Sequence, residues 1–162
     1  MSNEMITSEY SLRPVTEEDL PKLVEIEQKV HVAPWSLAHF RAETEKPYSQ
    51  VLVLTDDETD SQIAAYVVFW LMLDECEILN IAVDLPFRGL RFAKRMLRQV
   101  VNAATQKDLK RVVLDVRKSN QAAIQLYQGL GFAITQVRKS FYSNGEDAYQ
   151  MTLPLKDDSI QF

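Results

Sequence analysis

The segment with the clearest chemical potential is the turn Arg88-Gly89-Leu90-Arg91, which lies between an apolar run and an amphipathic helical pattern. The first N–H groups of a helix lack partners within the helix, and the helix dipole places partial positive charge on them. Gly89 lets the backbone approach a ligand closely, and the two arginines add donors suited to phosphate. The turn therefore indicates an anion site, although an ordinary strand–helix connection with solvated arginines would have the same pattern.

The elements on either side of this turn follow from the spacing of apolar residues. Residues 78–83 are mostly β-branched or large apolar types and predict a strand. Asp84 and Pro86 end the strand, because proline has no N–H and turns the chain. Apolar residues then recur at helical spacing, so we expect a helix over residues 89–107.

The rest of the chain alternates between strand and helix patterns. The strand that ends at Val83 is expected to begin at Glu75, so it covers 75–83, and further strands are expected at residues 10–15, 51–54, 63–73, 111–116, 132–141 and 147–155. Helices are expected at 20–30, after a Ser36 cap to about 43, and from Ser119 or Asn120 to 130. This order predicts an α+β fold with one mixed, mostly antiparallel sheet and helices on both faces. We expect one domain at residues 8–155, followed by a loose tail at 156–162.

Composition excludes several classes of protein. Of the 162 residues, 46% are hydrophobic and 25% are charged, which is typical of a globular domain. No run of about 18 apolar residues exists, and the polar first residues do not resemble a signal peptide, so we expect no membrane partner. A single cysteine, Cys76, excludes an internal disulfide and favours the cytoplasm. His31 and His39 have no metal-ligand spacing with it, so no metal site is expected.

Charge is distributed unevenly along the chain. Residues 1–85 carry 5 Lys/Arg and 17 Asp/Glu, whereas residues 86–118 carry 10 and 2. A basic segment inside an acidic protein suits a compact polyanion better than a long nucleic acid, which the remaining charge would repel. We therefore do not expect a nucleic-acid partner.

Several motifs occur in a characteristic order. They are Asn80-Ile81-Ala82-Val83-Asp84, Phe87-Arg88-Gly89-x-x-x-Ala93 and Leu114-Asp115-Val116-Arg117-x-Ser119-Asn120-x-Ala122-Ala123-Ile124-x-Leu126-Tyr127-x-x-Leu130-Gly131-Phe132. This combination resembles the GNAT superfamily of acetyl-CoA-dependent N-acetyltransferases. Pro34-Trp35-Ser36 and the late Phe141-Tyr142 with Glu146-Asp147-Ala148 resemble its RimI-type branch, which acetylates protein N-termini and includes the ribosomal-protein alanine acetyltransferase.

The resemblance implies a set of contacts with acetyl-CoA. The backbone that would bind the pyrophosphate consists of Arg88, Gly89, Leu90, Arg91, Phe92, Ala93 and Lys94. The pantetheine chain would pair with the strand Ile81-Ala82-Val83, in a gap where this central strand splays from the strand at 114–116. An N–H near Val83 would face the thioester oxygen, and a donor placed there is worth roughly 3 kcal/mol of barrier. Asn120 would donate to a pantetheine amide, cap its helix, or do both.

The resemblance also implies the catalytic groups. Tyr127 would protonate the leaving thiolate; its alternative role is a half-buried aromatic of a core helix. The base is Asp115, acting through a bridging water or simply paired with Arg117, or else Glu77, which could equally be a solvated strand residue. An α-amino group titrates near pH 8, so a weak base suffices and Cys76 need not be a nucleophile.

Trp35 and Tyr142 would line the groove for the acceptor peptide, or simply pack in the core. One departure from the family pattern is Arg91, where a second glycine is common; we expect its guanidinium to help bind CoA. The leading hypothesis is acetyl transfer to a protein N-terminus. The alternatives are transfer to a small amine or a lysine side chain, and a CoA-binding module or nucleic-acid binder that has lost catalysis.

Overall fold

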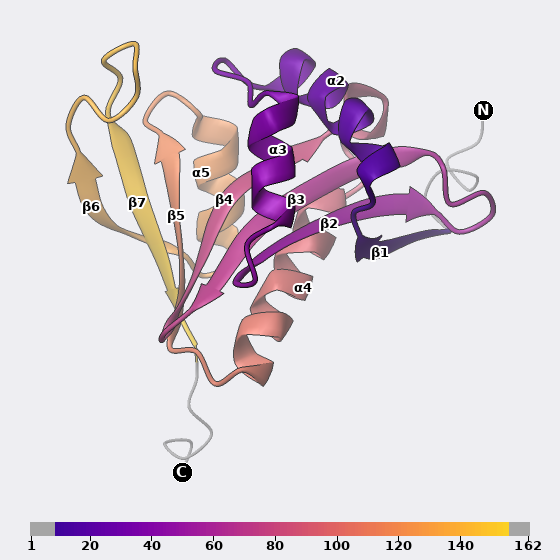
Figure 1. Cartoon of the computed structure of the whole chain (residues 1–162). Helices are drawn as coiled ribbons and strands as arrows, with labels where there is room; N and C mark the ends of the chain where they lie inside the picture. Colours follow the sequence, from indigo (N-terminus) through magenta and orange to yellow (C-terminus); the bar gives the residue numbers. More distant parts are fainter. Residues whose placement is uncertain (1–8, 156–162) are drawn as a thin grey trace. The chain divides into compact units, whose positions relative to one another are not determined.

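The computed structural model describes residues 9–155, whose seven strands hydrogen-bond in the order β1-β2-β3-β4-β5-β7-β6 (Figure 1). The strands are β1 (Tyr10–Pro14), β2 (Ser49–Asp56), β3 (Ile63–Met72), β4 (Glu75–Val83), β5 (Arg111–Arg117), β6 (Ala133–Arg138) and β7 (Ala148–Pro154). The helices are η1 (Glu17–Asp19), α2 (Leu20–Val30), α3 (Leu37–Thr44), η2 (Leu85–Phe87), α4 (Phe92–Gln106) and α5 (Gln121–Gly129). Strands β4 and β5 pair in parallel, whereas β1–β2, β2–β3, β5–β7 and β6–β7 are antiparallel. The predicted mixed, mostly antiparallel sheet is confirmed.

The chain divides into two compact units, and three elements contribute residues to both. One unit comprises Met1–Trp70 and Asn80–Gln99, and the other comprises Leu71–Leu79 and Val100–Phe162. The shared elements are β4, α4 and β3, and only the last two residues of β3 belong to the second unit. The predicted tail at 156–162 lies outside the described residues. None of the helices within residues 9–155 is long and apolar enough to cross a membrane.

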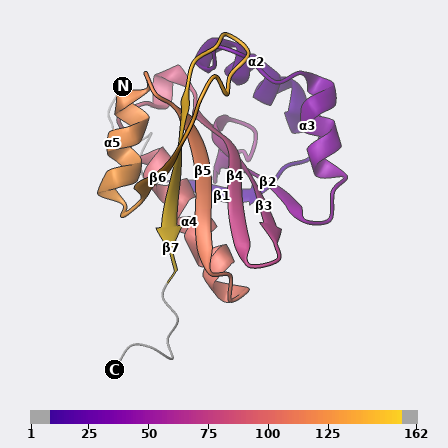
Figure 2. The ribbon, with the colours of Figure 1, turned by 90° about the vertical axis from the view of Figure 1, so that its left-hand side faces the viewer.

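The first unit is organised around β3. Its residues Ile63 to Phe69 are buried without a break, as the predicted strand buried on both faces requires. Figures 1 and 2 show α2 and α3 on one face of β2 and β3. Helix α2 directs Leu20, Leu23 and Ile26 into this core with no exposed surface, and Glu27 lies beside them, 1% exposed. A glutamate buried on the apolar face of a helix is costly to desolvate unless polar groups form hydrogen bonds to its carboxylate.

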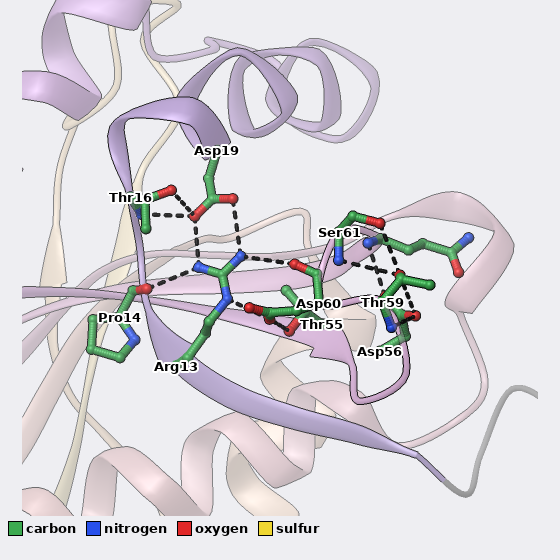
Figure 3. A network of polar contacts seen from close by, with 10 residues as sticks. Arg13, Pro14, Thr16, Asp19, Thr55, Asp56, Thr59, Asp60 and Ser61 are labelled. Atoms are coloured by element: carbon green, nitrogen blue, oxygen red, sulfur yellow. Dashed lines mark hydrogen bonds and ion pairs between the residues drawn. The ribbon is translucent and has the colours of Figure 1, made fainter.

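A polar network joins the first strand to the β2–β3 turn (Figure 3). Arg13 pairs with Asp19 at 2.7 Å and with Asp60 at 2.6 Å. Within the turn, the hydrogen bond from the Thr59 hydroxyl is the largest of the interactions that lower the pKa of Asp56 to about 2. The carboxylates of this turn therefore serve local structure.

The second unit contains the sheet from the start of β4 to β6. The register pairs Glu75 with Arg111 through Ile78 with Leu114, and β5 continues beside β7 (Figure 2). Helix α5 begins at an Asn120 cap, whose side chain accepts from the Ala123 N–H at 3.2 Å, so Asn120 rather than Ser119 is the cap. The predicted splay of β4 from β5 stays a prediction.

Two predicted boundaries, the start of α4 and the end of β6, were wrong by three residues. Helix α4 begins at Phe92 rather than Gly89, because Gly89 and Arg91 adopt left-handed φ angles of +81° and +63° that no α-helix contains. Strand β6 covers 133–138 rather than 132–141, and Ser140, with φ +50°, turns the chain beyond it.

Candidate active site

The segment of residues 89–94 forms a row of backbone donors in the first unit. The first hydrogen bond of α4 runs from the Arg95 N–H to the Arg91 carbonyl. Within residues 9–155, none of the six N–H groups from Gly89 to Lys94 makes a hydrogen bond of regular geometry. Gly89 and Arg91 have left-handed φ angles on either side of Leu90, and turns with alternating hand can direct successive N–H groups toward an anion. The anion-binding role of this turn stays a prediction.

Asp84 fixes the start of this turn. Its carboxylate is buried, accepts from the Leu85 N–H at 2.9 Å, and pairs with Lys29 at 2.8 Å. Lys22 approaches the same carboxylate at 3.9 Å. These contacts anchor the end of β4 to α2. They therefore fix the position of the chain just before the row of N–H groups at residues 89–94, here called the donor row.

Three cationic side chains accompany the donor row. Arg88 and Arg91 are exposed and Lys94 is half-buried. No acidic side chain in the described part of the chain lies within 4.0 Å of any of them. Arg95, by contrast, donates to the Tyr10 carbonyl at 2.6 Å and serves the fold. Three unpaired cations beside unpaired N–H groups suit a phosphate-bearing ligand.

The end of β4 leads into the same turn. Ala82 is buried, while Ile81 and Val83 are half-buried. The Ile81 carbonyl lies 3.2 Å from Nε2 of His31, at the C-terminal cap of α2. Trp35 belongs to the same unit, in the segment that joins α2 to α3, and its ring stacks on His39 at a centroid distance of 3.9 Å.

The second unit brings the two candidate bases to one face of its sheet. Glu77 pairs with Val113 in the register of β4 and β5, and Asp115 lies two residues further along β5, on the same side. Burial raises the pKa of Asp115. Burial, together with the charge of Asp115, raises the pKa of Glu77. Carboxylates with raised pKa values are better proton acceptors near neutral pH.

The predicted pairing of Asp115 with Arg117 was wrong. Asp115 lies 3.4 Å from Nε of Arg138, and neither of these two buried atoms has a hydrogen-bond partner in the described residues. Residue 115 also belongs to an interior strand, between β4 and β7, rather than to an edge. Arg138 was not singled out from the sequence, because it reaches Asp115 from β6, across β7.

Arg117 serves the loop between β6 and β7 instead. It pairs with Glu146 at 3.1 Å, and its guanidinium lies 3.9 Å from the ring centroid of Tyr142. Glu146 also accepts from the Ser119 N–H at 2.8 Å. These contacts fix half-buried Tyr142 and join its loop to the start of α5.

Tyr127 lies on α5 and is 7% exposed, with its ring centroid 5.8 Å from that of Phe132. Burial raises its pKa to about 12, so the hydroxyl is protonated at neutral pH. Within residues 9–155 this hydroxyl makes no hydrogen bond to the protein. Cys76 is buried, and burial raises the pKa of its thiol to about 12, which makes it a poor nucleophile.

The structure thus gathers the predicted residues in two sets. The first unit holds Trp35, Ile81, Ala82, Val83, Arg88, Gly89, Leu90, Arg91, Phe92, Ala93 and Lys94. The second holds Glu77, Asp115, Asn120, Tyr127 and Tyr142. Glu27, Arg138 and Glu146 have site contacts that the sequence reasoning missed. Glu27 carried a signal, since it lies four residues after Leu23 on the apolar stripe of α2, and Glu146 belongs to a quoted motif, although its contacts did not follow from that motif.

Comparison with known proteins identifies the family. The profile of the Acetyltransferase (GNAT) family matches residues 20–132, which include the donor row, both candidate bases and Tyr127. The chain belongs to the GNAT acetyltransferase family. Acetyl-CoA is the acetyl donor of GNAT enzymes, and the N–H groups and cations of residues 88–94, which have no ion pair within residues 9–155, fit its pyrophosphate.

Individual relatives agree with this assignment. The chain is 34% identical over 140 residues to the [ribosomal protein bS18]-alanine N-acetyltransferase of Salmonella typhimurium, covering 85% of this chain and 92% of that one. The crystal structure of the ribosomal-protein-S18-alanine N-acetyltransferase from Escherichia coli superposes with a TM-score of 0.82 at 29% identity, covering 94% and 98% of the two chains. The Ard1 structure from Thermoplasma volcanium shares the fold, with a TM-score of 0.84 at 24% identity and coverage of 93% and 100%. The predicted GNAT domain and its α+β fold are confirmed.

Proposed function

We propose that this chain transfers the acetyl group of acetyl-CoA to the free N-terminal α-amino group of a protein, with the N-terminal alanine of a bS18-type ribosomal protein as the acceptor. The observation that carries the proposal is the 34% identity over 140 residues to the Salmonella enzyme named for that acceptor. The half-buried acceptor-side residues Trp35 and Tyr142 are consistent with a peptide substrate. We assign the activity to residues 8–155, and we place it in the cytoplasm, where ribosomes are assembled.

The donor row supports the way in which acetyl-CoA is held. Its pyrophosphate would accept from the N–H groups of residues 89–94, with Arg88, Arg91 and Lys94 adding charge. The pantetheine chain would follow the backbone of residues 81–83, with Asn120 supplying a further polar contact. The side-chain oxygen of Asn120 already accepts the capping hydrogen bond of α5, so its amide N–H₂ group is the part that could donate to the ligand.

Arg91 offers a test of this assignment. Changing Arg91 to Gly or to Ala removes the same guanidinium, so we expect both variants to raise the Kd of acetyl-CoA about fivefold, or about 1 kcal/mol. Because φ at Arg91 is +63°, the Gly variant alone loses the left-handed strain, and its melting temperature should exceed that of the Ala variant by about 2–4 °C. Titration calorimetry and thermal unfolding measure the two effects. Unchanged or tighter binding in both variants would remove Arg91 from the site.

Proton transfers in the reaction require one donor and one acceptor. The Tyr127 hydroxyl, with a pKa of about 12, is protonated at neutral pH and would give its proton to the leaving thiolate. Asp115 or Glu77, each with a raised pKa, would accept the proton of the attacking ammonium group. No step needs a covalent intermediate on the enzyme, which agrees with the inert, buried Cys76.

Arg138 sets the pH dependence of either base. The charge of Arg138 lowers the pKa values of Asp115 and Glu77 and partly offsets the rise that burial causes. In an Arg138→Gln variant both pKa values should therefore rise further. Since a base acts only when deprotonated, the acid limb of kcat/KM should move to higher pH. Wild-type enzyme assayed with the same peptide corrects for ionisation of the acceptor amine. An acid limb that stays in place would exclude both carboxylates as the base.

The acceptor class can be tested with three forms of one peptide. The first carries a free N-terminal alanine followed by the sequence of a bS18-type ribosomal protein. The second is formylated at that N-terminus, and the third is formylated and contains an added lysine. We expect acetylation of the first form alone. Acetylation of the third form would contradict the proposal and favour the lysine alternative. Acetylation of a polyamine without acetylation of the first form would contradict it and favour the small-amine alternative.

A further inference from the structure

Glu27 is a buried carboxylate that gathers polar groups from several elements of the first unit. Its side chain accepts from the Tyr66 hydroxyl, from Asn80 Nδ2 at 3.0 and 3.1 Å, and from the Trp35 backbone N–H at 3.0 Å. Tyr66 belongs to β3, Asn80 to β4, and Trp35 to the segment between α2 and α3. One side chain therefore links an acceptor-side residue to the strand assigned to acetyl-CoA.

The network has no full cationic partner. Within residues 9–155 no Lys or Arg lies within 4.0 Å of the Glu27 carboxylate, and Nε2 of His31 is the nearest ring nitrogen, at 3.7 Å. Burial and the hydrogen bond to Glu27 raise the pKa of Tyr66 far above its usual value, so Tyr66 stays a donor. Hydrogen bonds thus provide the compensation that a buried carboxylate requires.

Two further contacts restrict the same region. Nε2 of His31 faces two acceptors, the Ile81 carbonyl and Glu27, so in the neutral ring the proton resides on this nitrogen. His31 thereby donates to β4 one residue beyond Asn80. The Trp35 ring stacks on His39 and lies 5.2 Å from the ring of Phe40. Trp35 is consequently held at both its backbone and its ring.

We propose that Glu27 is a positioning residue for the acceptor: it fixes the Trp35 segment against Asn80, so that the acceptor site is formed before the peptide binds. The inference rests on the proposed function, since it assumes that Trp35 contacts the acceptor. A methionine or leucine could fill the same volume without a desolvation cost, whereas a carboxylate that must accept from three directions specifies one arrangement of its partners. Preorganisation of this kind lowers the ordering cost of binding.

Glu27→Gln is the direct test. The variant keeps the size of the side chain but presents an N–H₂ group where an oxygen accepted, so at least one of the donors Tyr66, Asn80 and Trp35 meets another donor. We expect the KM of the acceptor peptide to rise about tenfold, while the Kd of acetyl-CoA stays within twofold. Loosening of the Trp35 segment affects the acceptor, whereas the donor row at residues 89–94 has its own anchor at Asp84.

A matched variant separates positioning from general destabilisation. Arg13→Gln breaks the ion pairs with Asp19 and Asp60 in the same unit and shares no residue with the Glu27 network (Figure 3). It should lower the melting temperature and leave the acceptor KM unchanged. The exchange Glu27→Gln with Asn80→Asp keeps one carboxylate and one amide in the network, and it should recover part of the lost acceptor affinity. It also provides a second variant if Glu27→Gln alone does not fold.

The outcomes distinguish this inference from the proposed function. A wild-type acceptor KM in the Glu27→Gln variant, or an equal rise in Arg13→Gln at a similar melting temperature, would overturn the positioning role. Failure of the wild-type enzyme to acetylate any free N-terminal peptide would instead overturn the proposed function.

Discussion

Tyr127→Phe is expected to lower kcat by about 100-fold to 1,000-fold, the contribution typical of a positioned general acid. The phenyl ring can keep its packing against Phe132, so the KM of acetyl-CoA and the melting temperature should change little. The hydroxyl makes no hydrogen bond within the described residues, so its loss leaves no buried protein group unpaired there. Steady-state kinetics with saturating acceptor peptide, together with thermal unfolding, measure both effects.

The pH profile gives a second, independent test of Tyr127. Its pKa of about 12 means that the acid form persists throughout the accessible range, so no loss of kcat up to about pH 10 should come from this residue. Tyr48→Phe is a suitable control because Tyr48 packs on Trp70 and belongs to no proposed site. Retention of near wild-type kcat by Tyr127→Phe would leave Tyr127 as a core aromatic only.

Local signals were sufficient for most of the fold. The continuous apolar run of β3 and the alternation in β1 follow from side-chain burial alone, and the Ser36 and Asn120 caps follow from residue type. The start of α4 did not follow, because helical periodicity of apolar residues says nothing about the φ angles of Gly89 and Arg91. The donor row exists because the helix begins three residues later than its periodicity indicates.

Contacts between distant residues could not be obtained in the same way. Arg138 reaches Asp115 only because β7 lies between β5 and β6, an order that no local pattern specifies. Arg117 is only two residues from Asp115 in the sequence and was therefore expected to pair with it. Instead, Arg117 forms an ion pair with Glu146 and packs on the ring of Tyr142. The candidate catalytic residues could thus be chosen from the sequence. The charged groups that shift their pKa values depend on strand order and could not.

Ala93→Pro should have the largest effect on cofactor binding among the changes that preserve the fold. Proline removes one N–H from the row of six and puts its ring where the ligand would accept. Proline is tolerated in the first helical turn, and α2 already carries Pro21 at its second position, the place that Ala93 has in α4. The helix should therefore persist, with a melting temperature close to that of the wild type.

A lost hydrogen bond to a charged group costs about 1.5–3 kcal/mol, so the Kd of acetyl-CoA should rise roughly tenfold to 100-fold in the Ala93→Pro variant. Ala93→Val is the matched control, because it adds comparable bulk and keeps the N–H. If the two variants weaken binding equally, crowding rather than the missing donor is responsible. If neither weakens it in titration calorimetry, the pyrophosphate does not bind at residues 89–94, and the unpaired N–H groups are only the solvated start of a helix.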